Sequence, residues 1–324
     1  MKAIVFEKYG PPGVLKLKEL EKPTPANNQV LIRIHASSVV AGDAEMRGFT
    51  FPMWFWLPLR LYAGAFKPKR VQVLGQEFAG VIEAVGSDVK GFKVGDAVFA
   101  PSDTGFGSHV EYKCFNTAKA IAKKPAKINY EQAACVPVGG LNSLHYLRLA
   151  NIRKGEKILI NGAAGNIGGF AVQIAKHMGA EVTAVDAGPK LAMLKKIGAD
   201  HVIDYTREDF TRNGETYDVI YDVVGKGAYF RCIRQLNRGG RYVIANPRVY
   251  HMILGLFVSW FTSKKSLFRF APYRTEDLEY LAGLMKAGKL KPYIGKTFTL
   301  SQMADAHRYV ETGTHTGNVV IKIQ

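Results

Sequence analysis

The sequence predicts an α/β protein of two domains, an all-β, barrel-like domain followed by a doubly wound parallel sheet. The chain has 324 residues, more than one hydrophobic core usually serves. Residues 1–122 read as short strands separated by glycine and proline, whereas residues 123–290 alternate short apolar runs with amphipathic helices. This alternation indicates a parallel sheet that is covered on both faces.

The expected first domain covers residues 1–122 and is completed by the C-terminal tail, residues 291–324. Its predicted strands are 3–6, 30–36, 78–85, 97–100 and 108–112, with a returning strand at 318–323. The expected second domain, 123–290, has predicted strands at 157–161, 181–185, 201–205, 217–224 and 241–246. Its predicted helices are 170–178, 190–197, 228–236 and 276–286.

A glycine-rich turn carries the strongest chemical signal. The sequence Asn161-Gly162-Ala163-Ala164-Gly165-Asn166-Ile167-Gly168 directly follows the predicted strand 157–161 and opens a helix near Asn166. Small residues let the backbone approach a pyrophosphate, and N–H groups at the helix N-terminus meet its charge. The pattern therefore predicts a dinucleotide site. The alternative is an α/β domain whose loop happens to be rich in glycine.

Asp186 follows the second strand of this domain, 21 residues after Gly165. A dinucleotide fold places the group that reads the adenosine ribose at this point. A carboxylate accepts hydrogen bonds from the ribose hydroxyls of NAD and repels the 2′-phosphate of NADP, so Asp186 favours NADH over NADPH. Lys190 and Arg207 lie near enough in sequence to neutralise a 2′-phosphate, which leaves NADPH as the alternative.

The charge balance is strongly basic. Forty-four Lys and Arg against 27 Asp and Glu give a formal net charge of +17, which indicates polyanionic partners: nucleic acid, anionic membrane or phosphorylated cofactors. The basic residues are scattered, which favours a solvated basic surface. The start of the sequence does not resemble a leader peptide, and Cys114, Cys135 and Cys232 form no CxxC pair, so a cytoplasmic location is expected.

Two apolar stretches, 49–66 and 250–261, are candidates for membrane contact. Pro52, Pro58 and other breakers interrupt the first, and the second has 12 residues against the roughly 20 that cross a bilayer, so neither is expected to span. Aromatic residues followed by the basic runs 67–70 and 264–265 suit a membrane surface. The alternative is that the insertion at 49–70 and an expected loop at 247–265 line an apolar substrate pocket or a subunit interface.

Several motifs occur together in one order along nearly the whole chain. They are Gly75-Gln76-Glu77-Phe78-Ala79-Gly80, Val94-Gly95-Asp96-Ala97-Val98, Gly139-Gly140-Leu141-Asn142-Ser143, the glycine-rich turn, Ile197-Gly198-Ala199-Asp200 and Asp222-Val223-Val224-Gly225. With them the sequence resembles the medium-chain dehydrogenase/reductase superfamily, on its zinc-free quinone oxidoreductase-like or enone reductase branch. The resemblance implies a GroES-like catalytic domain and a Rossmann cofactor domain.

The resemblance also implies where a nicotinamide cofactor binds. Asn142 would lie near the nicotinamide, and Val224, Gly225 and Asn246 would follow two strands beside the cofactor. The pyrophosphate would meet Gly162, Gly165, Asn166, Ile167 and Gly168. The adenosine ribose would meet Asp186, Lys190 and Tyr205.

The positions that hold catalytic zinc in related alcohol dehydrogenases are Val40, Gln76 and Val138 in this sequence. Two valines donate nothing to a metal, so no zinc is expected. The resemblance then implies hydride transfer from NAD(P)H to an activated acceptor, a quinone or an α,β-unsaturated carbonyl. Asp43 and Gln76 are the catalytic candidates. The alternative is that Asp43 binds only backbone or Arg47.

Tyr62 and His109 are two further candidate proton donors. Tyr62 is expected in a core, whereas His109 is expected to be accessible. The expected substrate is a small quinone or enone. The protein itself is expected to form a homodimer. The alternative function is a membrane-docked or RNA-binding NAD(P)H-sensing protein with little catalysis. Nucleic-acid binding is disfavoured because no aromatic-basic sheet motif or helix-turn-helix pattern occurs.

Overall fold

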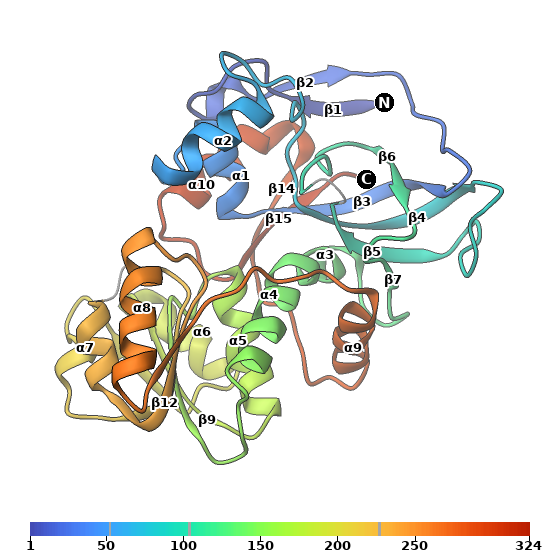
Figure 1. Cartoon of the computed structure of the whole chain (residues 1–324). Helices are drawn as coiled ribbons and strands as arrows, with labels where there is room; N and C mark the ends of the chain where they lie inside the picture. The colour runs from blue at the N-terminus through green and yellow to red at the C-terminus, as the bar shows by residue number, and fades with distance from the viewer. Residues whose placement is uncertain (52, 103–104, 226–227) are drawn as a thin grey trace. The chain divides into compact units, whose positions relative to one another are not determined.

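The computed structural model of the chain describes residues 1–51, 53–102, 105–225 and 228–324, and the side chains of residues 53–55 also lie outside the described part. The chain forms two units (Figure 1). The first unit combines Met1–Val138, Tyr273–Gly288 and Pro292–Gln324. The second combines Gly139–Pro272 with Lys289–Lys291.

The first unit is built on a seven-stranded sheet in the order β14-β15-β3-β4-β5-β7, with β6 also paired to β3. Its strands are β3 (Gln29–Val39), β4 (Glu77–Val85), β5 (Ala97–Pro101), β6 (Tyr112–Asn116), β7 (Ala122–Lys123), β14 (Ile294–Thr299) and β15 (Asn318–Lys322). All pairings are antiparallel except β14 with β15. A separate hairpin pairs β1 (Lys2–Val5) with β2 (Lys16–Glu19).

Two cores stabilise the first unit. Alternate residues of β3 and β4, including Ile32, Ile34 and Phe78, pack with Phe115 inside the sheet. A second core gathers residues of the helices around β15, such as Met46 and Met303. The helices are α1 (Ala41–Gly48), α2 (Met53–Ala63), α3 (Tyr130–Ala134), α9 (Thr275–Lys286) and α10 (Met303–Glu311), with 3-10 turns at Pro12–Val14 and Leu300–Gln302.

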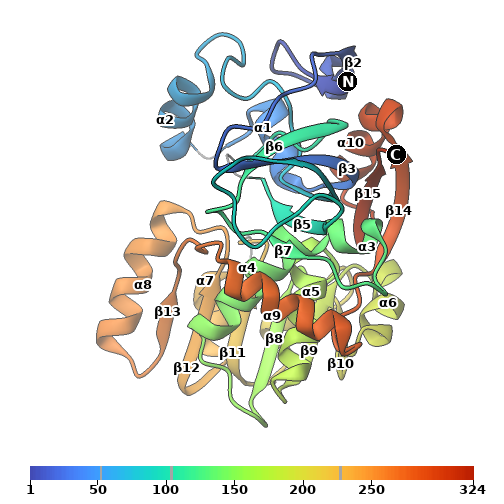
Figure 2. The same ribbon diagram turned by 90° about the vertical axis from the view of Figure 1, so that its right-hand side faces the viewer.

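The second unit is a parallel sheet in the order β10-β9-β8-β11-β12-β13, and Figure 2 shows β10 at one edge and β13 at the other. Its strands are β8 (Lys157–Asn161), β9 (Glu181–Asp186), β10 (His201–Asp204), β11 (Tyr217–Asp222), β12 (Leu236–Ile244) and β13 (Lys265–Leu267). Its helices are α5 (Asn166–His177), α6 (Leu191–Lys196), α7 (Tyr229–Arg234) and α8 (Val249–Phe261), preceded by α4 (Val136–Leu149), with 3-10 turns at Gly188–Lys190 and Phe210–Arg212.

The second unit follows the Rossmann strand order, because counting its strands along the chain gives the spatial order 3-2-1-4-5-6. The first unit is rich in β-strands, as predicted, so the two units together confirm the predicted α/β class. The boundaries between the units differ from those expected, since residues 123–138 and 273–288 join the first unit. The reason is packing: α3 lies against β3 and β4, and α9 lies against β7.

Two predicted segments have a different structure. The strand expected at 108–112 begins instead at Tyr112, because the N–H groups of Ser108 and His109 bond to the Leu74 carbonyl before the chain reaches β3. The loop expected at 247–265 contains the helix α8. A continuous apolar run has no periodicity that separates helix from loop or strand, so the sequence pattern did not reveal it.

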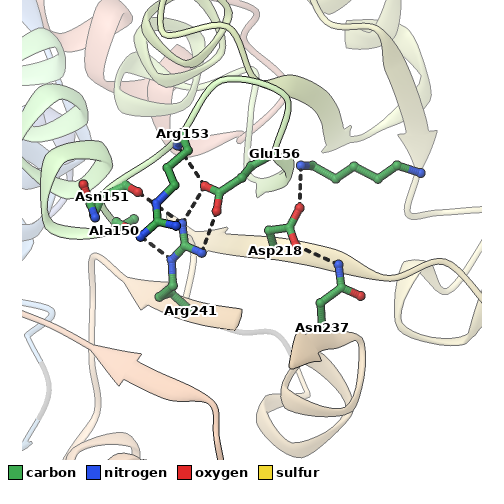
Figure 3. Close-up of polar contacts among 8 residues, drawn as sticks. Ala150, Asn151, Arg153, Glu156, Asp218, Asn237 and Arg241 are labelled. Atoms are coloured by element: carbon green, nitrogen blue, oxygen red, sulfur yellow. Dashed lines mark hydrogen bonds and ion pairs between the residues drawn. The ribbon is translucent and has the colours of Figure 1, made fainter. Parts of the chain in front are cut away.

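Arg241 of β12 holds the start of β8 in place (Figure 3). Its guanidinium binds both carboxylate oxygens of Glu156, at 2.9 and 2.6 Å, and donates to the carbonyl oxygen of Ala150 at 2.9 Å. Arg153 donates its backbone N–H to the same carboxylate at 2.8 Å. Such a two-pronged ion pair fixes both position and orientation. This network therefore holds the start of β8 against β12, at the end of the sheet where the strands begin.

Candidate functional site

The central strands of the second unit, β8 and β11, form its topological switch point. The crevice beyond the carboxyl ends of two such strands is where open α/β sheets bind ligands. Asp222 at the end of β11 organises this point: its carboxylate accepts from Asn161 Nδ2 and Gly225 N, both at 2.9 Å, and from the Tyr242 hydroxyl at 2.8 Å. Sequence reasoning placed Asp222 in a motif but assigned it no role.

The glycine-rich turn lies at this switch point and needs its glycines for different reasons. Gly162 has φ +81°, and a Cβ atom there would lie 2.5 Å from Val224 Cγ2. A Cβ atom on Gly168 would lie 2.2 Å from the Gly162 carbonyl oxygen. Gly165, in contrast, has only that oxygen near it, at 3.8 Å, so one side of the turn is open. Gly165 also begins α5 without a side-chain cap.

Of the residues predicted around the nicotinamide half, Gly225 and Asn246 lie together, just beyond the carboxyl ends of β11 and β12. Gly225 has φ +68°, and a Cβ atom there would lie 2.6 Å from the Asn246 carbonyl oxygen. Asn246 Nδ2 donates to the Val223 carbonyl at 3.0 Å. Asn142 is half-buried in α4, and the adjoining Ser143 ties α4 to α5 by donating to the Ile167 carbonyl at 2.6 Å.

The residues predicted for the adenosine ribose also come together, at the ends of β9 and β10. Asp186 is almost fully buried, and its carboxylate accepts the backbone N–H groups of Ala164 and Ala187, each at 2.9 Å. Lys190 Nζ lies 3.2 Å from the same carboxylate. Tyr205 donates its backbone N–H to the Asp186 carbonyl, while its side chain is exposed.

These features fit a dinucleotide. Gly165 leaves room above the turn, the first turn of α5 contains no acidic residue, and its N-terminal N–H groups suit a pyrophosphate. The Asp186 carboxylate adjoins the turn through Ala164, which is the place for a ribose. Because Asp186 already accepts two backbone bonds and pairs with Lys190, its charge is better compensated than the sequence suggested.

The first unit buries two carboxyl groups, those of Asp43 and of Glu77, the residue that follows the other catalytic candidate, Gln76. Asp43 has no exposed surface, and its carboxylate accepts the N–H groups of Val40 at 3.0 Å and Gly75 at 2.9 Å. Burial raises the pKa of Asp43 to about 7. Glu77, equally buried, accepts the Ser38 hydroxyl and the Val138 N–H, and burial raises its pKa to about 8.

Asp43 therefore has the backbone contacts of the alternative considered from the sequence, although Arg47 is not its partner. Arg47 donates to the Gly10 carbonyl at 3.0 Å and pairs with Glu311. Gln76 is half-buried and its side chain lies against α1, since a Cβ atom on Gly42 would be 2.2 Å from its Nε2. Glu77 follows Gln76 in the chain and accepts the Val138 N–H. The sequence analysis did not single it out, because it appeared there only as part of a motif.

The three positions implied for zinc do not fit that metal. Val40 begins α1 and Val138 lies in α4, and each contributes a backbone N–H to a carboxylate rather than a metal-binding side chain. Gln76 alone offers an oxygen. Among the described residues no group of three or more His, Cys, Asp or Glu is placed to hold a metal ion.

The two additional proton-donor candidates lie elsewhere than expected. His109 is fully buried, not accessible, and its Nε2 lies 3.1 Å from the Ser38 carbonyl oxygen. Burial lowers its pKa to about 4. Tyr62 is half exposed rather than part of a core, with the Arg70 guanidinium 5.0 Å from its ring centre. Of the aromatic insertion around it, Pro52 and the side chains of Trp54 and Phe55 lie outside the described residues.

Comparisons with known proteins agree with this architecture. Residues 26–141 match the family described as "Alcohol dehydrogenase GroES-like domain", and residues 197–321 match the "Zinc-binding dehydrogenase" family. The 2-methylene-furan-3-one reductase of Solanum lycopersicum is 33% identical over 99% of this chain and 79% of that protein. A quinone oxidoreductase of Pseudomonas aeruginosa is 30% identical over 99% of both chains.

A solved structure gives the same result. The quinone oxidoreductase from Coxiella burnetii superimposes with a TM-score of 0.88 at 31% identity, covering 100% of this chain and 99% of that one. The full-length match in sequence and structure, the Rossmann strand order and the glycine-rich turn at its switch point lead to one conclusion. The chain belongs to the medium-chain dehydrogenase/reductase superfamily, as an oxidoreductase of its quinone oxidoreductase-like branch.

Proposed function

We propose that this protein transfers a hydride from NAD(P)H, without zinc, to a quinone or to the carbon–carbon double bond of an α,β-unsaturated carbonyl. The observation that carries the proposal is the valine pair at positions 40 and 138, where related alcohol dehydrogenases hold a metal. Without that Lewis acid a simple ketone is poorly polarised, so the acceptor must already be activated. The relatives include one named for a furanone and others for quinones, in line with this class.

The chain's own residues would bind and orient the reactants. Gly162, Gly165 and the N-terminus of α5 would hold the pyrophosphate, and Asp186 with Lys190 the adenosine ribose. The bound nicotinamide supplies the hydride. We assign Gln76 the role of donating its amide N–H to the developing oxyanion. Asp43 is then a positioning residue, because it binds the N–H of Gly75 next to Gln76.

The test is oxidation of NADH and NADPH with a benzoquinone, a naphthoquinone, an enone, an enal and a simple ketone, each with and without a chelator. The proposal expects turnover of quinone or enone that resists the chelator, and none of the ketone. Loss of turnover in the chelator, restored by zinc, would overturn it. Gln76→Ala is expected to lower kcat/KM by about 10²-fold, with unchanged nucleotide affinity; a loss below about threefold removes Gln76 from the mechanism.

For the coenzyme we propose a mild preference for NADH, set by Asp186 and moderated by Lys190. Removing the carboxylate charge in Asp186→Asn should shift the ratio of the two dissociation constants toward NADPH, because it ends repulsion of a 2′-phosphate. Lys190→Ala should shift the ratio the opposite way, because it leaves the carboxylate unneutralised. Tenfold tighter binding of NADPH than NADH by the unaltered protein would contradict the preference.

We further propose a homodimer formed through an edge of the parallel sheet, where β13 and β10 each pair with a single strand among the described residues. An edge strand exposes backbone groups that another chain can pair. Light scattering at several concentrations should give twice the chain mass; a monomer at all of them contradicts the dimer. The alternative function, an NAD(P)H sensor with little catalysis, has no support among the named relatives.

A further inference from the structure

We propose that Asp222 is a positioning residue that aligns the nicotinamide end of the coenzyme with its pyrophosphate. It acts through two segments that border the predicted coenzyme site, Asn161 at the end of β8 and the loop 223–225 that follows β11. All of these residues belong to the second unit. The inference rests on the proposed function, because it requires that a dinucleotide binds at this switch point.

Asp222 is a buried carboxyl group at the end of a central strand. It is the last residue of β11 and is 1% exposed. Across the sheet it lies between Asn161 of β8 and Ile244 of β12. A carboxylate that is removed from water in this way is stable only when protein donors satisfy its oxygens. The donors that bind Asp222 therefore show which segments its side chain holds in place.

The two oxygens of this carboxylate bind different partners. Oδ1 accepts the Nδ2 amide of Asn161 and the backbone N–H of Gly225, each at 2.9 Å. Oδ2 accepts the hydroxyl of Tyr242, which is part of the core of the second unit, at 2.8 Å. Of the two oxygens, it is therefore Oδ1 that joins the start of the glycine-rich turn to the loop after β11.

The loop 223–225 lies against that turn. Gly225 has φ +68°, and the bond from its N–H to Asp222 closes this left-handed bend. Val224 lies over the first glycine of the turn, since a Cβ atom on Gly162 would be 2.5 Å from Val224 Cγ2. Val224 is nevertheless 42% exposed. It therefore borders the switch point, and its position depends on the bond between Asp222 and Gly225.

The adenosine end of the site is held by other groups. Ala163 donates its N–H to the Val185 carbonyl at 3.1 Å, and Ala164 donates its N–H to the Asp186 carboxylate at 2.9 Å. Neither bond involves Asp222. Loss of the Asp222 carboxylate should consequently move the loop after β11 relative to the turn and leave the adenosine end in place. Such a shift would affect the reaction, because hydride transfer depends on how the nicotinamide is oriented.

The test compares the binding of NADH with that of AMP, which contains only the adenosine half of the coenzyme, by titration of the full-length protein. Asp222→Ala should raise the dissociation constant of NADH about tenfold, because the Oδ1 hydrogen bonds are lost, and leave that of AMP unchanged. Asp222→Asn should retain NADH affinity, because its amide oxygen can replace Oδ1 and its amide N–H can donate to the Tyr242 oxygen. A purely structural role predicts no such difference between the two nucleotides.

Asp218→Ala is the matched control. Asp218 lies near the other end of β11 and accepts the same two kinds of donor as Asp222 (Figure 3). They are the backbone N–H of Lys157 at 2.9 Å and the side-chain amide of Asn237 at 2.8 Å. Asp218→Ala should lower the melting temperature and change neither nucleotide affinity, because its partners lie where the strands begin.

Asn161→Ala keeps the test decisive if Asp222→Ala does not fold. It removes one of the Oδ1 bonds and should weaken NADH binding about threefold, with AMP binding unchanged. NADPH replaces NADH throughout if the unaltered protein binds it more tightly. Equal losses for both nucleotides in Asp222→Ala, or unchanged NADH affinity in folded Asp222→Ala and Asn161→Ala, overturn this inference alone. An unaltered protein that binds neither NADH nor NADPH overturns the proposed function as well.

Discussion

Asp43 and Glu77 are carboxyl groups that the fold keeps away from water. Burial raises the pKa of Asp43 to about 7 and that of Glu77 to about 8. A raised carboxyl pKa means that the folded state binds protons more tightly than the unfolded state. The stability that this provides is complete below about pH 4, near the ordinary pKa values, and is lost as pH rises through 7 and 8.

We therefore expect the free energy of unfolding to fall between pH 6.5 and pH 8 in the unaltered protein, where buried histidines such as His307 are neutral in both the folded and the unfolded state. In Glu77→Gln that slope should shrink, because the amide does not titrate. Denaturant unfolding at four or five pH values measures it. Glu7→Gln is the control, because Glu7 is exposed and binds Lys18 at the surface. An identical slope in Glu77→Gln and the unaltered protein would show that Glu77 is ionised throughout.

His307 limits stability on the acid side. It is fully buried beside His109, with ring centres 6.2 Å apart, and neither of its ring nitrogens has a hydrogen-bond partner among the described residues. Burial lowers the pKa of His307 well below its ordinary 6.5. Stability is thus present above about pH 6.5 and lost as pH falls. His307→Phe should raise the melting temperature at pH 5 relative to that at pH 7, compared with the unaltered protein; an unchanged difference between the two pH values contradicts this.

At the residue scale, the sequence predicted where the candidate cofactor residues lie in the fold better than it predicted the surroundings of the candidate proton donors. The positions of Asp186, Lys190 and Tyr205 follow from strand ends in a regular sheet, which a sequence pattern locates well. The environments of His109 and Tyr62 depend on contacts between distant segments, such as His109 with Ser38. No local pattern contains that information.

At the element scale, the glycine-rich turn provides a paired prediction. Gly168→Ala should destabilise the second unit, because its methyl group would meet backbone at 2.2 Å. Gly165→Ala should leave stability nearly unchanged, since its methyl group meets nothing closer than 3.8 Å. It should nevertheless weaken nucleotide binding, because the methyl group occupies the side a pyrophosphate approaches. Calorimetry and nucleotide titration separate the two effects, and unchanged affinity in a folded Gly165→Ala would place the pyrophosphate elsewhere.

The same turn explains which elements were predictable. The strand 157–161 was predicted to the residue because turn signals bound a short apolar run on both sides. Helix α8 was not, since apolar residues on its buried and exposed sides remove the periodicity. Strand β6 begins later than predicted because the Ser108 backbone N–H bonds to the Leu74 carbonyl before the strand pairs with β3.

At the scale of the whole molecule, each unit has its own core, so their stabilities can be perturbed separately. Arg241→Lys loses the two-pronged bond to Glu156 and should destabilise the second unit by about 1–3 kcal/mol. Saturating nucleotide should offset part of this loss, because the ligand binds only the folded unit. Calorimetry with and without nucleotide measures both. Lys16→Arg in the first unit is the control, and a melting temperature unchanged in Arg241→Lys would show that the ion pair contributes little.

The division of the molecule into units was predicted in outline but not at its boundaries. Composition and rhythm change near residue 122, yet α3 and α9 pack with the first unit. The sequence of a helix shows which of its faces is apolar but not which sheet that face packs against. The return of a C-terminal strand at 318–323 to the first unit was predicted from its apolar run, and β15 pairs there with β14 and β3.

That returning strand imposes an order on the folding of the two units during protein synthesis. β15 pairs with β3, which is made almost three hundred residues earlier, and α10 completes a core of the same unit. Most of the second unit is continuous in the chain, Gly139–Pro272, and can fold while the ribosome is still working. The first unit must wait for β15, so the β3 edge of its sheet stays unpaired until residues 318–322 have been made, long after β3 itself.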